Sequence, residues 1–403
     1  MINVAILGFG TVGSGVAEVL TTNGGVIEQR VGQKVNLKYI LDVRDFSGSP
    51  YQDCFVKDFA IIENDPEVDI VVETIGGATV ALDFTTRALK AGKSVVSSNK
   101  ELVATHGYDL LQLAKEKGVS YLFEASVGGG IPILRPLTTC LAANQLNEVT
   151  GILNGTTNYI LTRMIRAGLT FEQALKEAQD NGYAEKDPTA DVEGHDACRK
   201  ICILAALAFG EHVYPDQVPT QGISGVSLAD VAYADSCGYK IKLLGRARRQ
   251  EDGKVCAFVA PHLVPAGNPL AGVEDVFNAI AVNGNAIGDA MFYGRGAGKL
   301  PTASAVVADV VDIAKDLKRD FRNQWGPGSK DLVVSSDLLA SRWYVRVNTS
   351  FAQARELFGD LQALARGGAP EGEVAFLTGE MTEPDIREKL SGLEVSTLLR
   401  VLG

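Results

Sequence analysis

An acidic stretch that ends in a lysine, residues 182–200, is the part of the sequence best suited to chemistry. At 3.6 residues per turn, Asp196 and Lys200 lie on one helical stripe above the apolar Ile203 and Leu207. An unpaired ion is costly to remove from water, so these charges should pair with each other or with a ligand. An ordinary ion pair at an exposed helix start is the alternative interpretation.

The neighbouring acids favour a ligand. Five carboxylates fall within twelve residues, at Glu185, Asp187, Asp191, Glu193 and Asp196. Such a set suits a ligand that carries an ammonium group, and Lys200 is the group able to exchange a proton with a hydroxyl. Partial burial lowers the pKa of a lysine toward neutrality, so Lys200 is a candidate acid or base.

A glycine-rich turn near the N-terminus predicts a dinucleotide site. The turn directly follows the apolar run 2–7, opens a helical pattern over 14–20, and consists of Gly8, Phe9, Gly10, Thr11, Val12 and Gly13. Gly8 permits the tight turn, Gly10 lets backbone approach a pyrophosphate, and Gly13 lets the helix pack close to the strand. The phosphates would then meet free N–H groups at the positive helix end.

Two other positions bear on the cofactor. A carboxylate at the end of the second strand suits the ribose hydroxyls of NAD, whereas a guanidinium suits the 2′-phosphate of NADP. This chain has both Asp42 and Arg44 on one strand face, and Asp45 is placed to neutralise Arg44, so both cofactors stay candidates. Lys100 follows another predicted strand end and so points toward the cofactor, with an exposed lysine at a helix start as the alternative.

Five small polar residues in a row precede a segment with helical apolar spacing: Asn154, Gly155, Thr156, Thr157 and Asn158. A helix cap uses one such residue. The remaining groups, Gly155 and Thr156 among them, are therefore candidate ligand contacts, and pure capping is the alternative.

The elements that must position these residues alternate through the first third of the chain. Apolar runs at 2–7, 37–43, 68–72, 94–97 and 119–123 predict buried parallel strands, with helices at 81–91 and 108–117. We therefore expect the α/β class, with a Rossmann-type doubly wound parallel sheet over residues 1–133. Residues 134–300 predict a second, α+β domain that contains a buried helix at 196–209.

Composition excludes several classes of protein. The 403 residues are 46% hydrophobic and 22% charged, which is typical of a folded chain of two or three domains. The net charge of −11 has the wrong sign for nucleic-acid binding. The most apolar segment, 201–209, is too short to span a bilayer, and the N-terminus has no signal-peptide pattern, so we expect a cytoplasmic protein without a membrane or nucleic-acid partner. The six cysteines are dispersed, and Cys198 and Cys202 are interpreted as small buried hydrophobes.

Six motifs in order resemble the homoserine dehydrogenase family, whose members interconvert L-homoserine and L-aspartate 4-semialdehyde with NAD or NADP. They lie at residues 8–13, 98–104, 124–133, 154–158, 182–200 and 294–303. The resemblance implies a catalytic and dimerisation role for residues 134–300. It also implies that Lys200 is the proton donor or acceptor, that Asp196 orients it, and that Lys100 lies between nicotinamide and substrate.

The same resemblance implies the remaining site residues. Glu185 would bind the substrate, with Tyr183 and Asp191 close by, and Gly298 would belong to the cofactor site. Oxygen ligands of a monovalent cation such as sodium would come from Glu124, Val127, Gly129 and Ile131. A helix over residues 301–320 would return to the cofactor domain.

The tail predicts a linker at 321–336 and a small domain at 337–403. Strands at 342–347, 362–366, 373–377 and 398–402, with helices at 352–364 and 384–390, give a β-α-β-β-α-β order that resembles an ACT domain. The usual acidic turn with proline and glycine is replaced by Asn348, Thr349, Ser350 and Phe351, so binding of a regulatory amino acid such as threonine and a structural or dimerising role both stay open. We expect a homodimer or homotetramer that serves threonine, methionine and isoleucine biosynthesis.

Two other classes share the cofactor fold. A dehydrogenase for another amino or hydroxy acid need not keep Glu185, Asp196 and Lys200 together. A redox sensor without catalytic activity would need a partner-binding surface, usually basic for DNA, which an acidic chain does not suggest.

Overall fold

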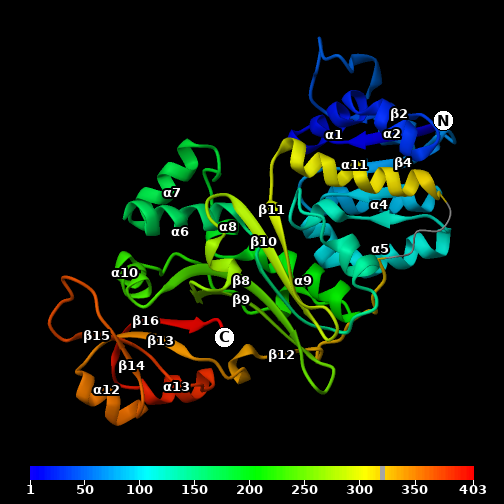
Figure 1. Cartoon of the computed structure of the whole chain (residues 1–403). Coiled ribbons are helices and arrows are strands. Elements are labelled where there is room, and N and C mark those ends of the chain that lie inside the picture. The colour runs from blue at the N-terminus through cyan, green and yellow to red at the C-terminus, as the bar shows by residue number, and fades with distance from the viewer. Residues whose placement is uncertain (318–322) are drawn as a thin grey trace.

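The computed structural model describes residues 1–317 and 323–403 (Figure 1). The end of the helix expected at 301–320 and the beginning of the linker expected at 321–336 lie outside these described residues. Within them, no helix has the combination of length and apolarity needed to cross a membrane.

The N-terminal part is built on a six-stranded parallel sheet, which confirms the doubly wound α/β class. Its strands are β1 (Ile2–Leu7), β2 (Val35–Leu41), β3 (Phe55–Val56), β4 (Val68–Glu73), β5 (Ser94–Ser97) and β6 (Tyr121–Leu122). The spatial order is β3-β2-β1-β4-β5-β6. The order reverses between β1 and β4, and the carboxyl ends of strands at such a switch point are where open α/β sheets bind ligands.

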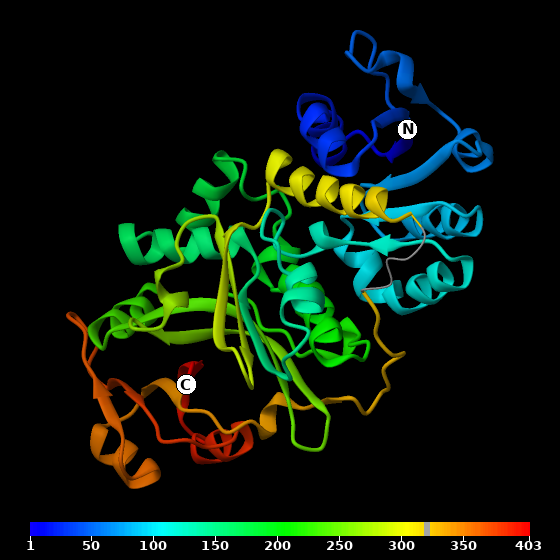
Figure 2. The ribbon, with the colours of Figure 1, turned by 45° about the vertical axis from the view of Figure 1, so that its right-hand side comes forward.

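Helices cover both faces of this sheet. They are α1 (Thr11–Thr22), α2 (Gly24–Val31), α3 (Phe59–Asn64), α4 (Thr79–Lys90), α5 (Lys100–Lys117) and the late helix α11 (Lys299–Lys315). The sequence pattern did not predict α2, α3 and β3. Figure 2 shows α11 lying along the N-terminal domain, where Ala303, Val306 and Val310 share one apolar core with Val4 and Ile6 of β1.

The middle of the chain folds around a mixed sheet. Its elements are β7 (Leu146–Ile152), α6 (Gly155–Ala167), α7 (Phe171–Asp180), α8 (Thr189–Val192), α9 (His195–Phe209), α10 (Leu228–Ser236), β8 (Tyr239–Arg249), β9 (Val255–Pro265), β10 (Phe277–Gly284) and β11 (Gly288–Arg295). Helix α9 is apolar nearly all round because the core surrounds it, and Ile201, Ile203 and Leu204 are fully buried. Cys198 and Cys202 are also buried there, as the sequence predicted.

The C-terminal residues form β12 (Val333–Val334), β13 (Trp343–Asn348), α12 (Phe351–Phe358), β14 (Gln362–Leu364), β15 (Glu373–Leu377), α13 (Glu383–Lys389) and β16 (Glu394–Val401). After β12, this is a β-α-β-β-α-β order. Helix α12 ends at Phe358 because Gly359 takes a positive φ of 69°, earlier than the pattern suggested. Its last expected residues instead form β14.

The sequence did not predict how the C-terminal strands join the middle sheet. Strand β16 pairs in parallel with β9, with Arg400 opposite His262 and Val401 opposite Leu263. The middle and C-terminal strands therefore form one ten-stranded sheet, with β12 beside β9 and the others in the order β11-β10-β7-β8-β9-β16-β13-β15-β14.

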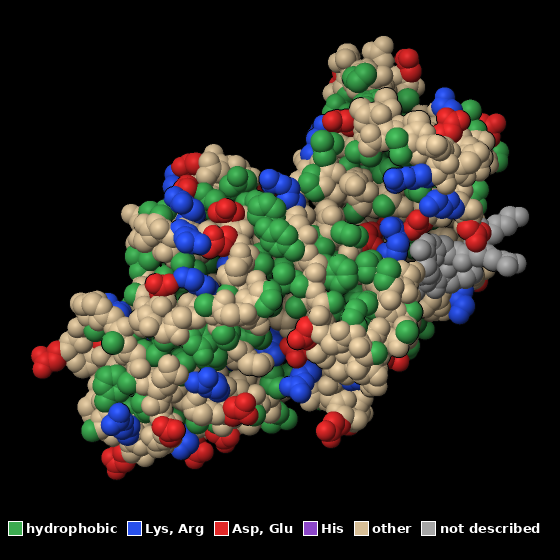
Figure 3. Space-filling view, viewed as in Figure 1, with side chains coloured by type: hydrophobic (Ala, Val, Ile, Leu, Met, Phe, Trp, Pro, Cys, Tyr) green, Lys and Arg blue, Asp and Glu red, His purple; other side chains and the backbone are tan. Residues whose placement is uncertain are grey.

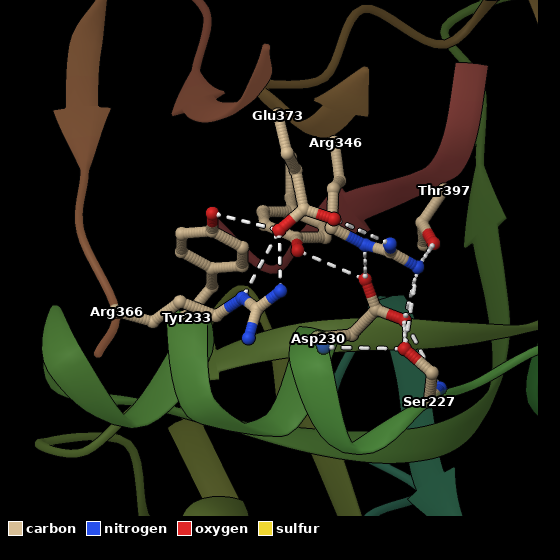
Figure 4. Close-up of polar contacts among 8 residues, drawn as sticks. Ser227, Asp230, Tyr233, Arg346, Arg366, Glu373 and Thr397 are labelled. Carbon is tan, nitrogen blue, oxygen red and sulfur yellow. Dashed lines mark hydrogen bonds and ion pairs between the residues drawn. The ribbon is translucent and has the colours of Figure 1, made fainter. Parts of the chain in front are cut away.

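A buried polar cluster also fastens the C-terminal strands to α10 (Figure 4). Asp230 of α10 is fully buried and accepts hydrogen bonds from Tyr344 Oη at 2.9 Å and Arg346 Nε at 2.8 Å. Arg346 also reaches Glu373 at 3.1 Å, and Glu373 accepts from Arg366 at 2.6 Å. Each buried charge is thus paired across the junction.

Candidate active site

The predicted proton-exchange pair lies at the start of α9 and is buried. Lys200 Nζ is 2.7 Å from Asp196 Oδ2 and donates a second hydrogen bond of 2.7 Å to the carbonyl of Leu153, the residue directly after β7. Both side chains are nearly closed to solvent, so the pair is not the exposed ion pair of the alternative interpretation. An ammonium has three N–H donors, and these two contacts use two of them.

A second ammonium approaches the same carboxylate from the other domain. Lys100 is the first residue of α5, and its Nζ lies 2.5 Å from Asp196 Oδ1. Asn154 Nδ2 adds hydrogen bonds of 2.9 Å to Asp196 and 2.7 Å to Asp191. The structure therefore brings Lys100, Asp191, Asp196 and Lys200 together where the parallel sheet meets the middle domain.

Burial and these charges set the protonation of the cluster. Burial opposes ionisation of Asp196, but the charges of Lys200 and Lys100 outweigh it and hold the pKa of Asp196 below its usual range. Burial lowers the pKa of Lys200, with the charge of Lys100 acting in the same direction. Burial also lowers the pKa of Lys100, but the charge of Asp196 overcomes this and raises it. Burial and the Asp196 charge raise the pKa of Asp191. Lys200 is thus the lysine of the pair that more readily loses its proton.

The polar run before α6 serves two purposes. Asn154 caps the helix, because its side chain accepts from Thr157 N at 2.8 Å, while its amide also holds the two carboxylates. Asn158 is structural, since its amide donates to the carbonyls of Val273, Asp275 and Phe277. The contact between Asn154 and the carboxylates was not predicted, and an asparagine cap gives no sequence signal for it.

The predicted substrate residues come from two places, the start of α6 and the loop that follows α7. Gly155 opens α6, and Thr156 donates a 2.7 Å hydrogen bond to the Tyr183 carbonyl. The Tyr183 side chain is 46% exposed and packs edge-on against Tyr159. Glu185 is exposed, and its carbonyl accepts from Gln179 at 3.1 Å. The contact of Glu185 with a substrate stays a prediction.

The glycine turn fits a dinucleotide. Gly8 has a φ of +90°, and a Cβ on Gly13 would collide with the Gly8 carbonyl oxygen. A Cβ on Gly10 would instead meet open space, and no side chain caps the first turn of α1, which begins with Thr11 and Val12. Backbone N–H groups are therefore free at a positive helix end, as a pyrophosphate requires.

A cavity of about 540 Å³ adjoins this turn and is lined by Gly8, Gly10, Asp42, Val43, Arg44, Thr74, Ile75 and Gly76 among others. Gly298, with a φ of +124°, is the N-cap residue directly before α11, and the next residue, Lys299, lies against Gly15 of α1. Late and early segments of the chain thus meet at α1, the helix that follows the glycine turn.

Arg44 pairs with Asp42, which corrects the expectation that Asp45 neutralises it. Arg44 Nη2 lies 2.9 Å from Asp42 Oδ2, and Arg44 Nε lies 3.1 Å from Asp42 Oδ1. Asp45 instead accepts from the backbone and hydroxyl of Ser47. Asp42 also accepts from Phe9 N at 2.7 Å, and the Phe9 ring packs against Phe46 and Phe55.

In the predicted cation segment, the carboxylate of Glu124 binds backbone N–H groups later in the chain. Glu124 is buried, and its side chain accepts from the backbone N–H groups of Ile133, Leu134 and Arg135 at 2.6–2.9 Å. Three contacts occupy most of the lone pairs of a carboxylate, which leaves main-chain carbonyl groups as the principal candidate ligands. The sodium site stays a prediction.

Glu73 is a buried acid that the sequence analysis did not single out, and the next residues, Thr74 and Ile75, line the cavity beside the glycine turn. It ends β4 and is fully buried. The available signal was an acid that directly follows the apolar run 70–72 and ends the strand.

Comparison with known proteins gives one consistent result. The family model described as "Homoserine dehydrogenase, NAD binding domain" matches residues 8–124, and the one described as "Homoserine dehydrogenase" matches residues 132–311. The homoserine dehydrogenase of Bacillus subtilis (strain 168) is 38% identical over 100% of this chain and 98% of its own length. A solved homoserine dehydrogenase from Thiobacillus denitrificans is 35% identical, with a TM-score of 0.89 over 100% of this chain and 98% of that one. A hyperthermophilic archaeal homoserine dehydrogenase in complex with NADPH is 28% identical, with a TM-score of 0.65 over 77% of this chain and 97% of that one. Because these matches cover both the cofactor turn and the lysine–carboxylate cluster, the chain belongs to the homoserine dehydrogenase family.

Proposed function

We propose that this chain interconverts L-homoserine and L-aspartate 4-semialdehyde with NAD or NADP, and that Lys200 exchanges the proton. The observation that carries the assignment is the buried cluster in which Asp196 lies 2.7 Å from Lys200 and 2.5 Å from Lys100. The cluster joins the domain with the cofactor turn to the domain with the acidic stretch. We assign the reaction to the cytoplasm and to threonine, methionine and isoleucine biosynthesis.

The nicotinamide supplies or accepts the hydride when the cofactor is bound. The chain must then move one proton at the substrate oxygen. In the oxidising direction, the neutral amine of Lys200 takes the hydroxyl proton, and in the reducing direction its ammonium returns one. Asp196 fixes the orientation of Lys200, and the charge of Lys100 supports the lowered pKa of Lys200.

The substrate is held from the acidic side of the cluster. The exposed carboxylate of Glu185 would pair with the substrate ammonium, with Asp191 and Tyr183 beside it. Gly155 and Thr156 would contact the substrate from the start of α6. Such fixing of the reacting carbon against the ring accounts for several kcal/mol of an enzyme's rate enhancement.

For the cofactor, the backbone of Gly8, Gly10, Thr11, Val12 and Gly13 would hold the pyrophosphate, with Gly298 closing the site. Phe9 would contribute by fixing the turn, because its N–H is bonded to Asp42 and its ring packs on Phe46 and Phe55. Asp42 and Arg44 would meet the adenosine ribose from the cavity wall. Sodium would be held by the carbonyl groups of Val127, Gly129 and Ile131, with Glu124 shaping their loop.

The boundaries 1–133, 134–300, 321–336 and 337–403 divide the chain into cofactor domain, catalytic domain, linker and ACT-like domain in this proposal. The β-α-β-β-α-β order of the last segment supports the ACT-like assignment. Its sheet is continuous with the catalytic sheet through β16 and β9, which supports a structural role for it.

We also assign a homodimer or homotetramer. Strand β11 is an edge strand, and Met291 and Tyr293 on it are exposed. Apolar side chains gather over β10 and β11 in the middle of Figure 3. An exposed edge with apolar side chains is suited to pairing with a second copy.

The test is an assay of the purified chain with L-homoserine and NAD⁺ or NADP⁺, followed by nicotinamide absorbance. We expect turnover with at least one cofactor, and a loss of about 100-fold or more in Lys200→Ala with cofactor binding intact. Lys176→Ala is the matched control, because Lys176 pairs with Asp180 on exposed α7. Cofactor binding without turnover by the parent chain would favour a sensor, and near-normal turnover in Lys200→Ala would remove the assigned proton role.

A further inference from the structure

A closed ring of hydrogen bonds links the cavity wall to the start of α5. Glu73 Oε1 accepts from Ile75 N at 2.7 Å, and Glu73 Oε2 accepts from Ser97 Oγ at 2.6 Å. Ser97 Oγ in turn accepts from Asn99 N at 3.0 Å, and Asn99 Nδ2 donates to the Ile75 carbonyl at 3.0 Å. The ring therefore begins and ends at Glu73.

This ring determines where α5 begins. The Asn99 side chain caps α5 by accepting from Leu102 N at 3.1 Å, and it also holds the Gly77 carbonyl at 2.7 Å. The next residue is Lys100, whose ammonium contacts Asp196. A movement of the cap would therefore move the origin of the Lys100 side chain.

We propose that Glu73 is a positioning residue for Lys100: its buried carboxylate holds Ser97 and Ile75, and through Asn99 it fixes the helix start that places the Lys100 ammonium against Asp196. This role rests on the proposed function, because Lys100 matters only if the cluster exchanges the proton.

The buried surroundings of Glu73 agree with a positioning role. Burial raises the pKa of Glu73 to about 7, while the hydrogen bonds from Ser97 and Ile75 act in the opposite direction. Tyr121 of β6 is also buried there, and both burial and the charge of Glu73 raise the pKa of its phenol. Burying an acid costs folding free energy. The hydrogen bonds that Glu73 makes, which an apolar side chain could not make, offset part of this cost.

The test compares Glu73→Leu with Glu73→Gln. The leucine leaves the Ser97 hydroxyl and the Ile75 N–H without their acceptor, so we expect kcat for homoserine oxidation to fall roughly 10- to 100-fold, as for a displaced catalytic group. The amide keeps an acceptor for Ile75 N and can donate to Ser97, so Glu73→Gln should recover most of the loss. Should the leucine variant fail to fold, Ser97→Ala removes the same link more mildly.

A pH profile separates positioning from simple destabilisation. The charge of Lys100 lowers the pKa of Lys200, and Asp196 and Asp191 are the acids that face the same amine and raise it. Moving Lys100 away therefore raises the pKa of Lys200, so the rising limb of kcat against pH should shift to higher pH in Glu73→Leu and in Ser97→Ala. The control is Lys93→Leu, because Lys93 is also buried and holds the carbonyl groups of Asp65 and Val68 at the opposite end of β4.

A double-mutant cycle completes the test. In a Lys100→Met background, Glu73→Leu should produce no further shift of the limb. An unshifted limb in both Glu73→Leu and Ser97→Ala, an equal shift in Lys93→Leu, or a full additional shift in the Lys100→Met background would each overturn the role of Glu73. Lys200→Ala, measured in parallel, tests the proposed function separately. An inactive parent chain would overturn both.

Discussion

At the scale of single residues, the site depends on one carboxylate shared by two ammonium groups. Asp196 stabilises the charged form of the buried Lys200, while the positive charge of Lys100 destabilises it. Burial is the largest cause that lowers the pKa of Lys200, and the charge of Lys100 adds to it against the charge of Asp196. Burial and the second lysine together therefore make Lys200 a group that can release its proton.

This arrangement predicts a pH effect in Lys100→Met. The charge of Lys100 lowers the pKa of Lys200, so its removal raises that pKa. Oxidation of homoserine uses the neutral amine, hence its rising limb should move to higher pH, while reduction of the aldehyde should persist to higher pH. Profiles of kcat in both directions measure this. A limb that stays in place, or moves to lower pH, would contradict the proposed charge coupling.

Residue spacing made part of the site predictable. Asp196 and Lys200 are one helical turn apart, so their pairing is a local property of the sequence. The contact between Lys100 and Asp196 joins two domains, and no local pattern encodes it. The partner of Arg44 was predicted wrongly because Asp42 and Asp45 are both near it in sequence. The structure shows that the backbone and hydroxyl of Ser47 engage Asp45, while Asp42 pairs with Arg44.

At the scale of elements, the turn between β1 and α1 needs its glycines for different reasons. A Cβ at Gly13 meets backbone atoms of Gly8 and lies 2.9 Å from Thr74 Oγ1, whereas a Cβ at Gly10 meets open space. The fold therefore requires a glycine at position 13, whereas no contact within the described chain requires one at position 10.

The two alanine variants should therefore separate. Gly13→Ala should lower the free energy of unfolding by about 1–3 kcal/mol, because the helix can no longer pack against the turn. Gly10→Ala should leave stability unchanged and weaken cofactor binding roughly 10-fold or more, because a methyl group blocks the close approach of the pyrophosphate. Thermal unfolding without cofactor and a fluorescence titration with NADPH or NADH measure the two effects. Equal loss of stability in both variants would refute this division.

The predictable elements were the long ones with a regular period, such as β1, β4, α5 and α9. Helix α2 begins with two glycines, which are poor helix formers, and its Ile27 packs into the core with β1 and α11. Strand β3 has two residues and exists through its pairing with β2. Such elements are determined by tertiary packing, which a local pattern does not contain.

At the scale of the whole molecule, the C-terminal strands are fixed to α10 by buried charge. The Asp230 carboxylate is fully buried, and Arg346 is its ionic partner (Figure 4). No local spacing predicts this junction, since its partners come from α10, β13 and β15.

Arg346→Met alone should therefore destabilise the chain by about 3–5 kcal/mol, since it leaves the buried Asp230 without an ionic partner. Asp230→Ala should cost less, because Arg346 keeps its ion pair with Glu373. The double variant Asp230→Leu, Arg346→Met should be less damaging than the sum of the single ones. In the parent chain, the pKa of Asp230 lies below its usual range: burial opposes its ionisation, and the contact with Arg346 outweighs burial. Its contribution is thus present above about pH 4 and lost as the pH falls further. Denaturant melts at several pH values measure this, and strictly additive losses would contradict the pairing.

The parallel pairing of β16 with β9 has a consequence during synthesis. Translation from the end of β9 to the end of β16 takes on the order of ten seconds at ~5–20 residues per second. Throughout that interval, the backbone near Leu263 has no partner for the bond that Leu402 N later makes at 2.8 Å. During that interval the nascent chain therefore has an unpaired strand edge at β9, and such an edge can pair with another polypeptide.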